Sequence, residues 1–267
     1  MTEKEPGARY VDLMAGIDAE IAALSKELES ELTRKRGKLN ALIWRLQKAK
    51  GAFAHYFSDS GQDYVVDNFV FKGKEAGTFV EVGAFDGVQS SACMYFEMVR
   101  GWSGLVIEAN PQLVKKAQLA RKSEVIEAVV SEAGVETEFL MVDTQREFAM
   151  LGGIKDTLPK ATVKALADGA LEAHYMTVKT RRLGDILEAK KLSQIDLLTL
   201  DIQGAELGVL QSIPFDKFDI TAICVKNQNS DDSIAEVLYP QGYVLADYLG
   251  FDELYVKEAV QIENMGG

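Results

Sequence analysis

The sequence predicts an α/β protein with a seven-stranded, mostly parallel sheet and a long N-terminal helical arm. Three observations support this prediction. Short, apolar, β-rich runs alternate with segments of helical periodicity over most of the chain. A glycine turn joins the first of these runs, Thr78–Val82, to a helical segment. Residues 1–50 differ from the rest, because they contain few helix breakers and no β-rich run.

The first 50 residues are predicted to form an amphipathic helical arm, attached to one α/β domain over residues 51–267. Residues 10–50 read as one long helix, with a bend expected at Gly37. Apolar side chains recur at helical steps in two runs: Ile17, Ile21, Leu24 and Leu28, and then Leu39, Leu42, Ile43 and Leu46. The first half of the arm is acidic, whereas residues 34–50 carry only basic charges.

This charge pattern leaves three interpretations of the arm open. Two antiparallel copies would match opposite charges over an apolar seam, which favours a coiled coil in a homodimer or with a partner protein. A helix folded back on its own domain explains the pattern equally well. Residues 34–50 could also lie on a membrane surface with Trp44 at the interface, although the acidic bulk of the protein disfavours this.

The remaining elements follow the alternating order that builds a parallel sheet. Strands are expected at Thr78–Val82, 105–107, 125–130, 196–201 and 220–225, followed by a closing hairpin at 243–248 and 253–257. Helices are expected at 88–99, 112–121, 182–189, 205–212 and 233–239. Two further β segments, 137–142 and 175–182, flank a short helix at 160–167. This order is typical of a Rossmann-like sheet with an antiparallel edge.

The turn after the first strand predicts a nucleoside pocket. Gly83 and Gly87 bracket a tight turn, and the exposed N–H groups of the following helix face it. The second strand ends at Glu108, about 20 residues beyond Gly87, where an acid binds the ribose hydroxyls of a nucleoside in doubly wound sheets. The alternative is a plain strand, turn and helix without a ligand.

The residues of the turn distinguish between adenosine ligands. A dinucleotide site needs G-x-G-x-x-G, and here Phe85 stands where the second glycine is required. Glu81 and Asp86 place negative charge where a pyrophosphate would lie, but suit a ligand with an amine and a sulfonium. The turn therefore favours S-adenosylmethionine and disfavours a nucleotide-dependent oxidoreductase.

Three ordered blocks resemble the FkbM family of S-adenosylmethionine-dependent methyltransferases. They are FVEVGAFDG (residues 79–87), GWSGLVIEANP (101–111) and IDLLTLDIQGAELGVLQSI (195–213), within a similarity over about residues 60 to 260. The resemblance implies a class I methyltransferase domain that methylates hydroxyl groups. The cofactor is expected to contact Glu81, Gly83, Ala84, Phe85, Asp86, Gly87, Glu108 and Ala109, with Asp201 at the floor of the pocket.

Chemistry in such a sheet belongs at the carboxyl ends of the strands. Asp201 ends the fourth strand and is expected to face the transferred methyl group. Glu206 follows in the first turn of the next helix, where it serves either the site or the helix dipole. Gln203 departs from the family, in which glutamate is usual, so one negative charge is missing.

Lys226 occupies the position at the end of the fifth strand where the family usually has an acid. A divalent metal bridging that position and Asp201 is therefore disfavoured, and no metal is expected. Lys226 is a candidate general base if burial lowers its pKa, and otherwise it pairs with Asp201 or Glu206 and orients the site.

Residues 143–174 form a long segment between two β segments, as lids and acceptor-binding walls often do. His174 lies within it and is a candidate base because histidine titrates near neutral pH. A structural role for this histidine is the alternative.

Composition and charge limit the classes of substrate and cellular location that the protein can have. The net charge is −12, and residues 51–267 hold 19 Lys and Arg against 33 Asp and Glu, so a nucleic-acid substrate is disfavoured. No apolar run is long enough to insert stably in a membrane, and the charged N-terminus does not resemble a signal segment. With two distant cysteines, a cytoplasmic enzyme is expected.

These observations together predict a metal-independent O-methyltransferase that uses S-adenosylmethionine. Its acceptor is expected to be a small molecule or glycan: a sugar, a glycan or another natural product. The alternative is a binding or scaffold protein built on a degenerate methyltransferase domain, suggested by Gln203 and Lys226.

Overall fold

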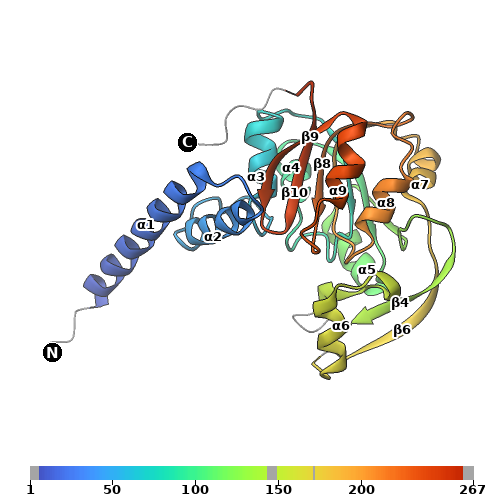
Figure 1. The fold of residues 1–267 in the computed structure, drawn as a ribbon, viewed down its shortest axis with the longest axis horizontal. Coiled ribbons are helices and arrows are strands. Elements are labelled where there is room, and N and C mark those ends of the chain that lie inside the picture. The colour runs from blue at the N-terminus through green and yellow to red at the C-terminus, as the bar shows by residue number, and fades with distance from the viewer. Residues whose placement is uncertain (1–5, 143–148, 171, 261–267) are drawn as a thin grey trace.

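A seven-stranded sheet forms the centre of the computed structural model, which describes residues 6–142, 149–170 and 172–260 (Figure 1). Its strand order is β3-β2-β1-β7-β8-β10-β9. The strands are β1 (Thr78–Val82), β2 (Ser103–Glu108), β3 (Glu124–Glu127), β7 (Gln194–Leu200), β8 (Asp219–Lys226), β9 (Tyr243–Leu249) and β10 (Asp252–Lys257). All pairings in this sheet are parallel except those of β10 with β8 and β9, which confirms the predicted, mostly parallel sheet with an edge hairpin.

The central strands are apolar on both faces because both faces are covered. Val80 and Val82 of β1 belong to one buried cluster, whereas Phe79 on the same strand belongs to another. Strands buried on both sides read as continuous apolar runs, which is why this part of the sheet could be predicted from the sequence. The main helices are α3 (Gln62–Val65), α4 (Met94–Val99), α5 (Pro111–Ala120), α7 (Leu183–Lys190), α8 (Glu206–Ser212) and α9 (Ser233–Leu238).

Helix α4 begins later than the sequence predicted. The expected helix at 88–99 forms only from Met94, and the preceding residues are turns. The Asp86 carboxylate accepts hydrogen bonds from Val88 N (2.9 Å) and Gln89 N (2.8 Å), and Ser90 has φ +62°. A side chain that satisfies these N–H groups, followed by a left-handed residue, replaces the first turns of the helix.

The two additional β segments form a second, smaller sheet in the order β5-β4-β6. Its strands are β4 (Glu136–Val142), β5 (Gly153–Ile154) and β6 (Ala173–Lys179), and α6 (Lys160–Ala167) lies beside them (Figure 1). Phe139 and Ile154 pack with Val129 and Ala205, so an apolar contact joins this sheet to the carboxyl end of the main one.

The N-terminal segment consists of two helices, α1 (Pro6–Ser30) and α2 (Lys35–Ala49), not of one long helix. The helix is interrupted between Ser30 and Lys35, before Gly37. In this interruption the Glu31 carboxylate accepts hydrogen bonds from Thr33 N (2.8 Å) and Thr33 Oγ1 (2.6 Å). Arg36 donates to the Leu28 carbonyl (2.9 Å) and so caps the end of α1. Helix α1 extends away from the sheet, whereas α2 packs on β9 (Figure 1).

Gly37 serves as a contact point for α2. A Cβ atom here would lie 2.3 Å from the Gly250 carbonyl oxygen, and Gly250 N donates to the Gly37 carbonyl at 3.0 Å. Trp44 is buried in the same helix. Helix α2 therefore folds back on its own domain, as one of the three interpretations held. Within the described ranges, no helix combines the length and the apolarity needed to cross a membrane.

Candidate active site

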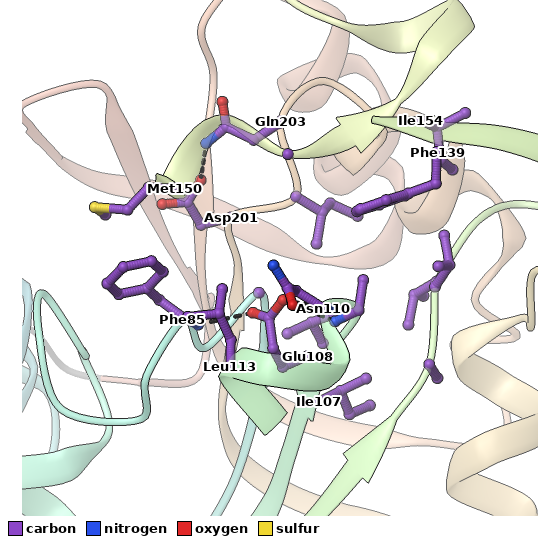
Figure 2. A pocket seen from close by; sticks show the side chains of 18 of the residues that line it. Phe85, Ile107, Glu108, Asn110, Leu113, Phe139, Met150, Ile154, Asp201 and Gln203 are labelled. Atoms are coloured by element: carbon purple, nitrogen blue, oxygen red, sulfur yellow. Dashed lines mark hydrogen bonds between the residues drawn. The ribbon is translucent and has the colours of Figure 1, made fainter. Parts of the chain in front are cut away.

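Two connected cavities open at the carboxyl ends of the parallel strands. The inner cavity, about 680 Å³ with its space open to solvent, lies between β1, β2 and the second sheet (Figure 2). The outer cavity, about 1890 Å³ with its space open to solvent, lies between α2, the loop after β1 and the ends of β7 and β8. Five residues line both cavities: Val82, Gly83, Phe85, Met150 and Asp201. The two cavities therefore adjoin at the strand ends where the sequence predicted the site.

Glu108 is the buried acid of the inner cavity. Its carboxylate accepts hydrogen bonds from Phe85 N (2.8 Å), Ala109 N (2.9 Å) and Asn110 N (2.9 Å). Burial raises the pKa of Glu108 to about 7 against these hydrogen bonds, which favour its charged form. Glu108 thereby ties the loop after β1 to the end of β2, and it lines the cavity where the sequence predicted a ribose-binding acid.

The glycine turn brings β1 close to β7. Gly83 has φ +84°, and a Cβ atom there would lie 1.9 Å from the Asp201 carbonyl oxygen, so only glycine fits. Phe85 also has positive φ (+53°), a conformation that bulky residues rarely adopt. The hydrogen bond from Phe85 N to Glu108 holds it there. Phe85 therefore projects between the two cavities.

Only some of the other turn residues that were predicted to contact the cofactor line a cavity. Asp86 caps backbone N–H groups, and Gly87 packs against Ala117, so neither residue lines a cavity. Ala84 lines the outer cavity and Ala109 the inner one. Of the two acids expected to face a cationic ligand, only Glu81 reaches the cleft.

The charge of Glu81 is already compensated within the protein. Its carboxylate pairs with Arg121 Nη1 (2.6 Å) and accepts from Ser91 Oγ (2.7 Å). The Arg121 side chain is completely buried, pairs also with Glu97 (3.0 Å), and lies over the Phe79 ring. No spacing motif in the sequence singles out this arginine, which directly follows α5. The sequence of the turn suggested that the negative charge of Glu81 is free to face a cationic ligand. The structure shows instead that Arg121 neutralises it.

Asp201 pairs with Lys226 at the junction of the cavities. Lys226 Nζ donates to Asp201 Oδ2, and Gln203 Nε2 donates to Asp201 Oδ1 (3.2 Å). Burial lowers the pKa of Lys226, but the charges of Asp201 and Asp252 outweigh it, so the pKa lies above its ordinary value. The pairing predicted as the alternative role of Lys226 is confirmed, and the lowered pKa that a base would need is not found.

Glu206 holds the loop between β7 and α8. Its buried carboxylate accepts from Ile202 N (2.8 Å) and Gly204 N (2.8 Å), and it lines neither cavity. Burial raises the pKa of Glu206 to about 7. Gln203 has φ +57° in this loop, so two strand-end loops of the site each contain a strained residue. Glu206 acts through the backbone of the site.

The segment at 143–174 contributes one wall of the inner cavity. Met150, Gly152 and Ile154 line it, and Phe139 of β4 lies beside Ile154 (Figure 2). Residues 143–148 of this segment lie outside the described residues. His174 is exposed on β6 and lines neither cavity, so the structure does not bring this candidate base to Asp201.

The inner cavity fits an adenosine group. Its walls are mostly apolar, as the planar face of a base requires. Glu108 keeps acceptor capacity beyond its backbone bonds, because an ionised carboxylate offers about four lone-pair sites. The residues present therefore suit S-adenosylmethionine, whose ribose Glu108 would bind.

Such a cavity at the first two strand ends of a parallel sheet defines a nucleoside-binding α/β enzyme. Residues 81–245 match the model of the methyltransferase FkbM domain. The chain therefore belongs to the FkbM methyltransferase family and is an S-adenosylmethionine-dependent methyltransferase. No curated protein matches it.

Several solved structures resemble the chain loosely. An FkbM methyltransferase from Methylobacillus flagellatus KT is 13% identical, with a TM-score of 0.43, over 88% of this chain and 58% of that one. A TehB-like S-adenosylmethionine-dependent methyltransferase from Corynebacterium glutamicum is 11% identical, with a TM-score of 0.39, over 84% and 99%. Aeropyrum pernix fibrillarin with bound S-adenosylmethionine is 10% identical, with a TM-score of 0.41, over 76% and 74%.

Proposed function

We propose that this protein methylates a hydroxyl group of a sugar, glycan or other natural product, without a metal ion. The observation that carries the proposal is the meeting of the two cavities at Gly83, Phe85 and Asp201. A donor in the inner cavity and an acceptor in the outer one would face each other across these residues. Positioning of this kind supplies most of the acceleration in a direct transfer.

The proposed step is a single displacement. The residues around Glu108 would hold S-adenosylmethionine, which would supply a methyl group on a positively charged sulfur; the acceptor oxygen would form the new C–O bond as the C–S bond breaks and its electron pair stays on sulfur. The hydroxyl proton leaves the oxygen in the same step. Asp201 is the acid that lines both cavities, so its carboxylate is the candidate to accept this proton or to orient the hydroxyl.

Lys226 fits an orienting role. Its raised pKa keeps it protonated at neutral pH, so it holds Asp201 and does not remove a proton. The ammonium group also occupies the carboxylate oxygen that a bridging metal would need, which supports metal independence. If Lys226 were the base, Lys226→Met would abolish turnover. We expect a loss of about tenfold or less.

Calorimetry followed by a transfer assay tests this function. The protein should bind S-adenosylmethionine and S-adenosylhomocysteine but not NAD, and should move a labelled methyl group from the former to members of a panel of hydroxyl compounds. Methylation confined to nitrogen or carbon acceptors would contradict O-methylation. Genes for glycosyltransferases or polyketide synthases beside this one would indicate the acceptor group to test first.

The scaffold interpretation stays open because Gln203 and Lys226 depart from the family. It is supported by the pairing of Asp201 with Lys226, which could indicate a site that has lost its chemistry. Cofactor binding without transfer to any compound of the panel would favour it. Binding of neither cofactor would favour it more strongly.

Helix α1 is the part of the predicted arm that remains available for a homodimer or a partner protein. Tyr10, Val11 and Leu13 are exposed on it. Light scattering tests dimerisation: a dimer that becomes monomeric when residues 1–30 are removed supports it, and an unchanged monomeric mass contradicts it. A cytoplasmic location also stays a proposal, supported by the free, buried thiols of Cys93 and Cys224.

A further inference from the structure

Helix α2 forms a fixed wall of the outer cavity. Asn40 Nδ2 donates to the Tyr248 carbonyl (2.7 Å), and Trp44 Nε1 donates to the Ser58 carbonyl (3.1 Å). Arg36 pairs with Asp247 at 2.5 Å. Together with the contact of Gly37 and Gly250, these bonds fasten one face of α2 to the domain over most of its length. The opposite side chains are therefore held in constant positions along the cavity.

The basic residues from position 34 to 50 differ in whether the protein satisfies them. Partnered residues include Arg34 with Glu253 and Asp232, Lys35 with Glu27, Arg36 with Asp247, Lys48 with the Tyr56 carbonyl, and Lys50 with Asp18. Lys38 and Arg45 are exposed and have no hydrogen-bond or ion-pair partner in the described ranges. Both line the outer cavity. The two cations that the protein leaves unpaired in this segment thus face the cleft.

Most acids of the outer cavity are already engaged. Glu81 pairs with Arg121, Asp201 with Lys226, and Glu253 with Arg34. The Asp252 carboxylate is buried and accepts from Gln62. Asp59 is the acid of this lining without a partner in the described part of the chain. The α2 wall therefore presents uncompensated positive charge in a protein whose net charge is −12.

We propose that Lys38 and Arg45 bind acidic groups of the methyl acceptor, so that the acceptor is a hydroxyl compound carrying carboxylate or phosphate. This inference rests on the proposed function and specifies its substrate class. Lys38 and Arg45 are seven residues apart on one helix face, about 10 Å along the axis. An extended acceptor suits this spacing, with its anionic groups on α2 and a hydroxyl reaching Asp201. Arginine and lysine both form charge-assisted hydrogen bonds to such groups.

Matched neutral and acidic probes test the proposal on the full chain loaded with S-adenosylhomocysteine. The pairs are p-nitrophenyl glucoside with p-nitrophenyl glucuronide, for carboxylate, and glucose with glucose 6-phosphate, for phosphate. Binding is measured by NMR titration at low and high salt. We expect the acidic member of at least one pair to bind about tenfold tighter or more, and the preference to shrink with salt.

The double variant Lys38→Gln with Arg45→Gln should abolish this preference while the dissociation constant for S-adenosylhomocysteine stays unchanged. The matched control is Arg9→Gln with Lys26→Gln, which removes the same charges from exposed positions on α1 outside both cavities. The control should keep the preference. No preference in the wild type, or one that survives the Lys38 and Arg45 changes, overturns the proposal.

The same experiments separate this inference from the proposed function. An acidic preference that depends on Lys38 and Arg45, without methyl transfer from S-adenosylmethionine to any probe or panel compound, would support the anion site and contradict the enzyme. Methyl transfer by the wild type to the neutral and the acidic member of each pair with equal efficiency would support the enzyme and contradict the anion site.

Discussion

The inner and outer cavities are built in different ways. The inner cavity takes its glycine turn and its buried acid, Glu108, from the ends of β1 and β2, which are close together in the sequence, and the second sheet and the loop after β7 complete its apolar walls. The outer cavity joins α2, the segment before α3, and the ends of β8 and β9, and its charges are mostly paired. The cofactor side thus depends on local backbone geometry, whereas the acceptor side depends on contacts between distant segments.

The largest effect is expected where the cavities meet. Asp201→Asn should lower kcat about 10²- to 10⁴-fold, because the amide can neither take a proton nor hold a hydroxyl as a carboxylate does. The dissociation constant for S-adenosylhomocysteine should change by only a few-fold, since the ribose contact expected at Glu108 is kept. Single-turnover methyl transfer and calorimetry measure the two quantities.

Asp219→Asn is the matched control for this change. Asp219 begins β8 at the opposite end from the site and forms an exposed ion pair with Lys257. Exposed pairs contribute little, so kcat should stay within twofold. A kcat near that of the wild type in the Asp201 variant would remove Asp201 from the chemistry and leave positioning alone.

Glu108→Gln should act on cofactor binding and spare the chemistry. At pH 8 the carboxylate is mostly ionised, and the amide keeps one acceptor oxygen for three backbone N–H groups and the ribose. We expect the dissociation constant for S-adenosylmethionine to rise about 100-fold, with kcat at saturation little changed. Glu124→Gln, at an exposed ion pair on β3, should leave both unchanged. Unaltered affinity in the Glu108 variant would place the nucleoside elsewhere.

Much of the inner cavity could be predicted because its determinants are local. Gly83 directly follows β1 and Glu108 ends β2, two consecutive strands whose apolar runs are easy to recognise. The α2 wall of the outer cavity could not be predicted, because the contact of Gly37 with Gly250 joins residues far apart in the sequence. Gly37 therefore looked like a bend in a long helix. Arg121 was missed for the same reason, since its burial against Glu81 appears only after folding.

Glu108 and Glu206, the two buried acids of the strand-end loops, should both contribute to the pH dependence of the free energy of unfolding. Burial raises the pKa of Glu108 and of Glu206 to about 7, above the ordinary value of 4.5. Between these two pH values the folded state binds more protons than the unfolded state. The two acids therefore make their full contribution to the free energy of unfolding below pH 4.5, and this contribution is lost as the pH rises through 7. We expect the ligand-free protein to lose about 2 kcal/mol per acid between pH 5.5 and 8, by urea denaturation.

Glu206→Gln separates the contributions of the two acids. It should reduce this pH slope by about half, and also lower stability at pH 5.5 because one backbone N–H loses its acceptor. Asp252, whose pKa burial raises to about 6, adds a slope of the same sign. A free energy of unfolding that rises from pH 5.5 to 8 would show that neither carboxyl is protonated in the folded state.

The smallest effect is expected at His174, the residue type best suited to proton removal at neutral pH. It lies exposed on β6, beyond the apolar wall that the second sheet gives to the inner cavity, and lines neither cavity. His174→Ala should therefore leave kcat and the pH profile of turnover within about twofold of the wild type. A drop of tenfold or more, with an acidic limb lost from the pH profile, would mean that the second sheet moves over the cleft during turnover. In that case β6 would form part of the acceptor side during turnover, although it lies apart from Asp201 in this structure.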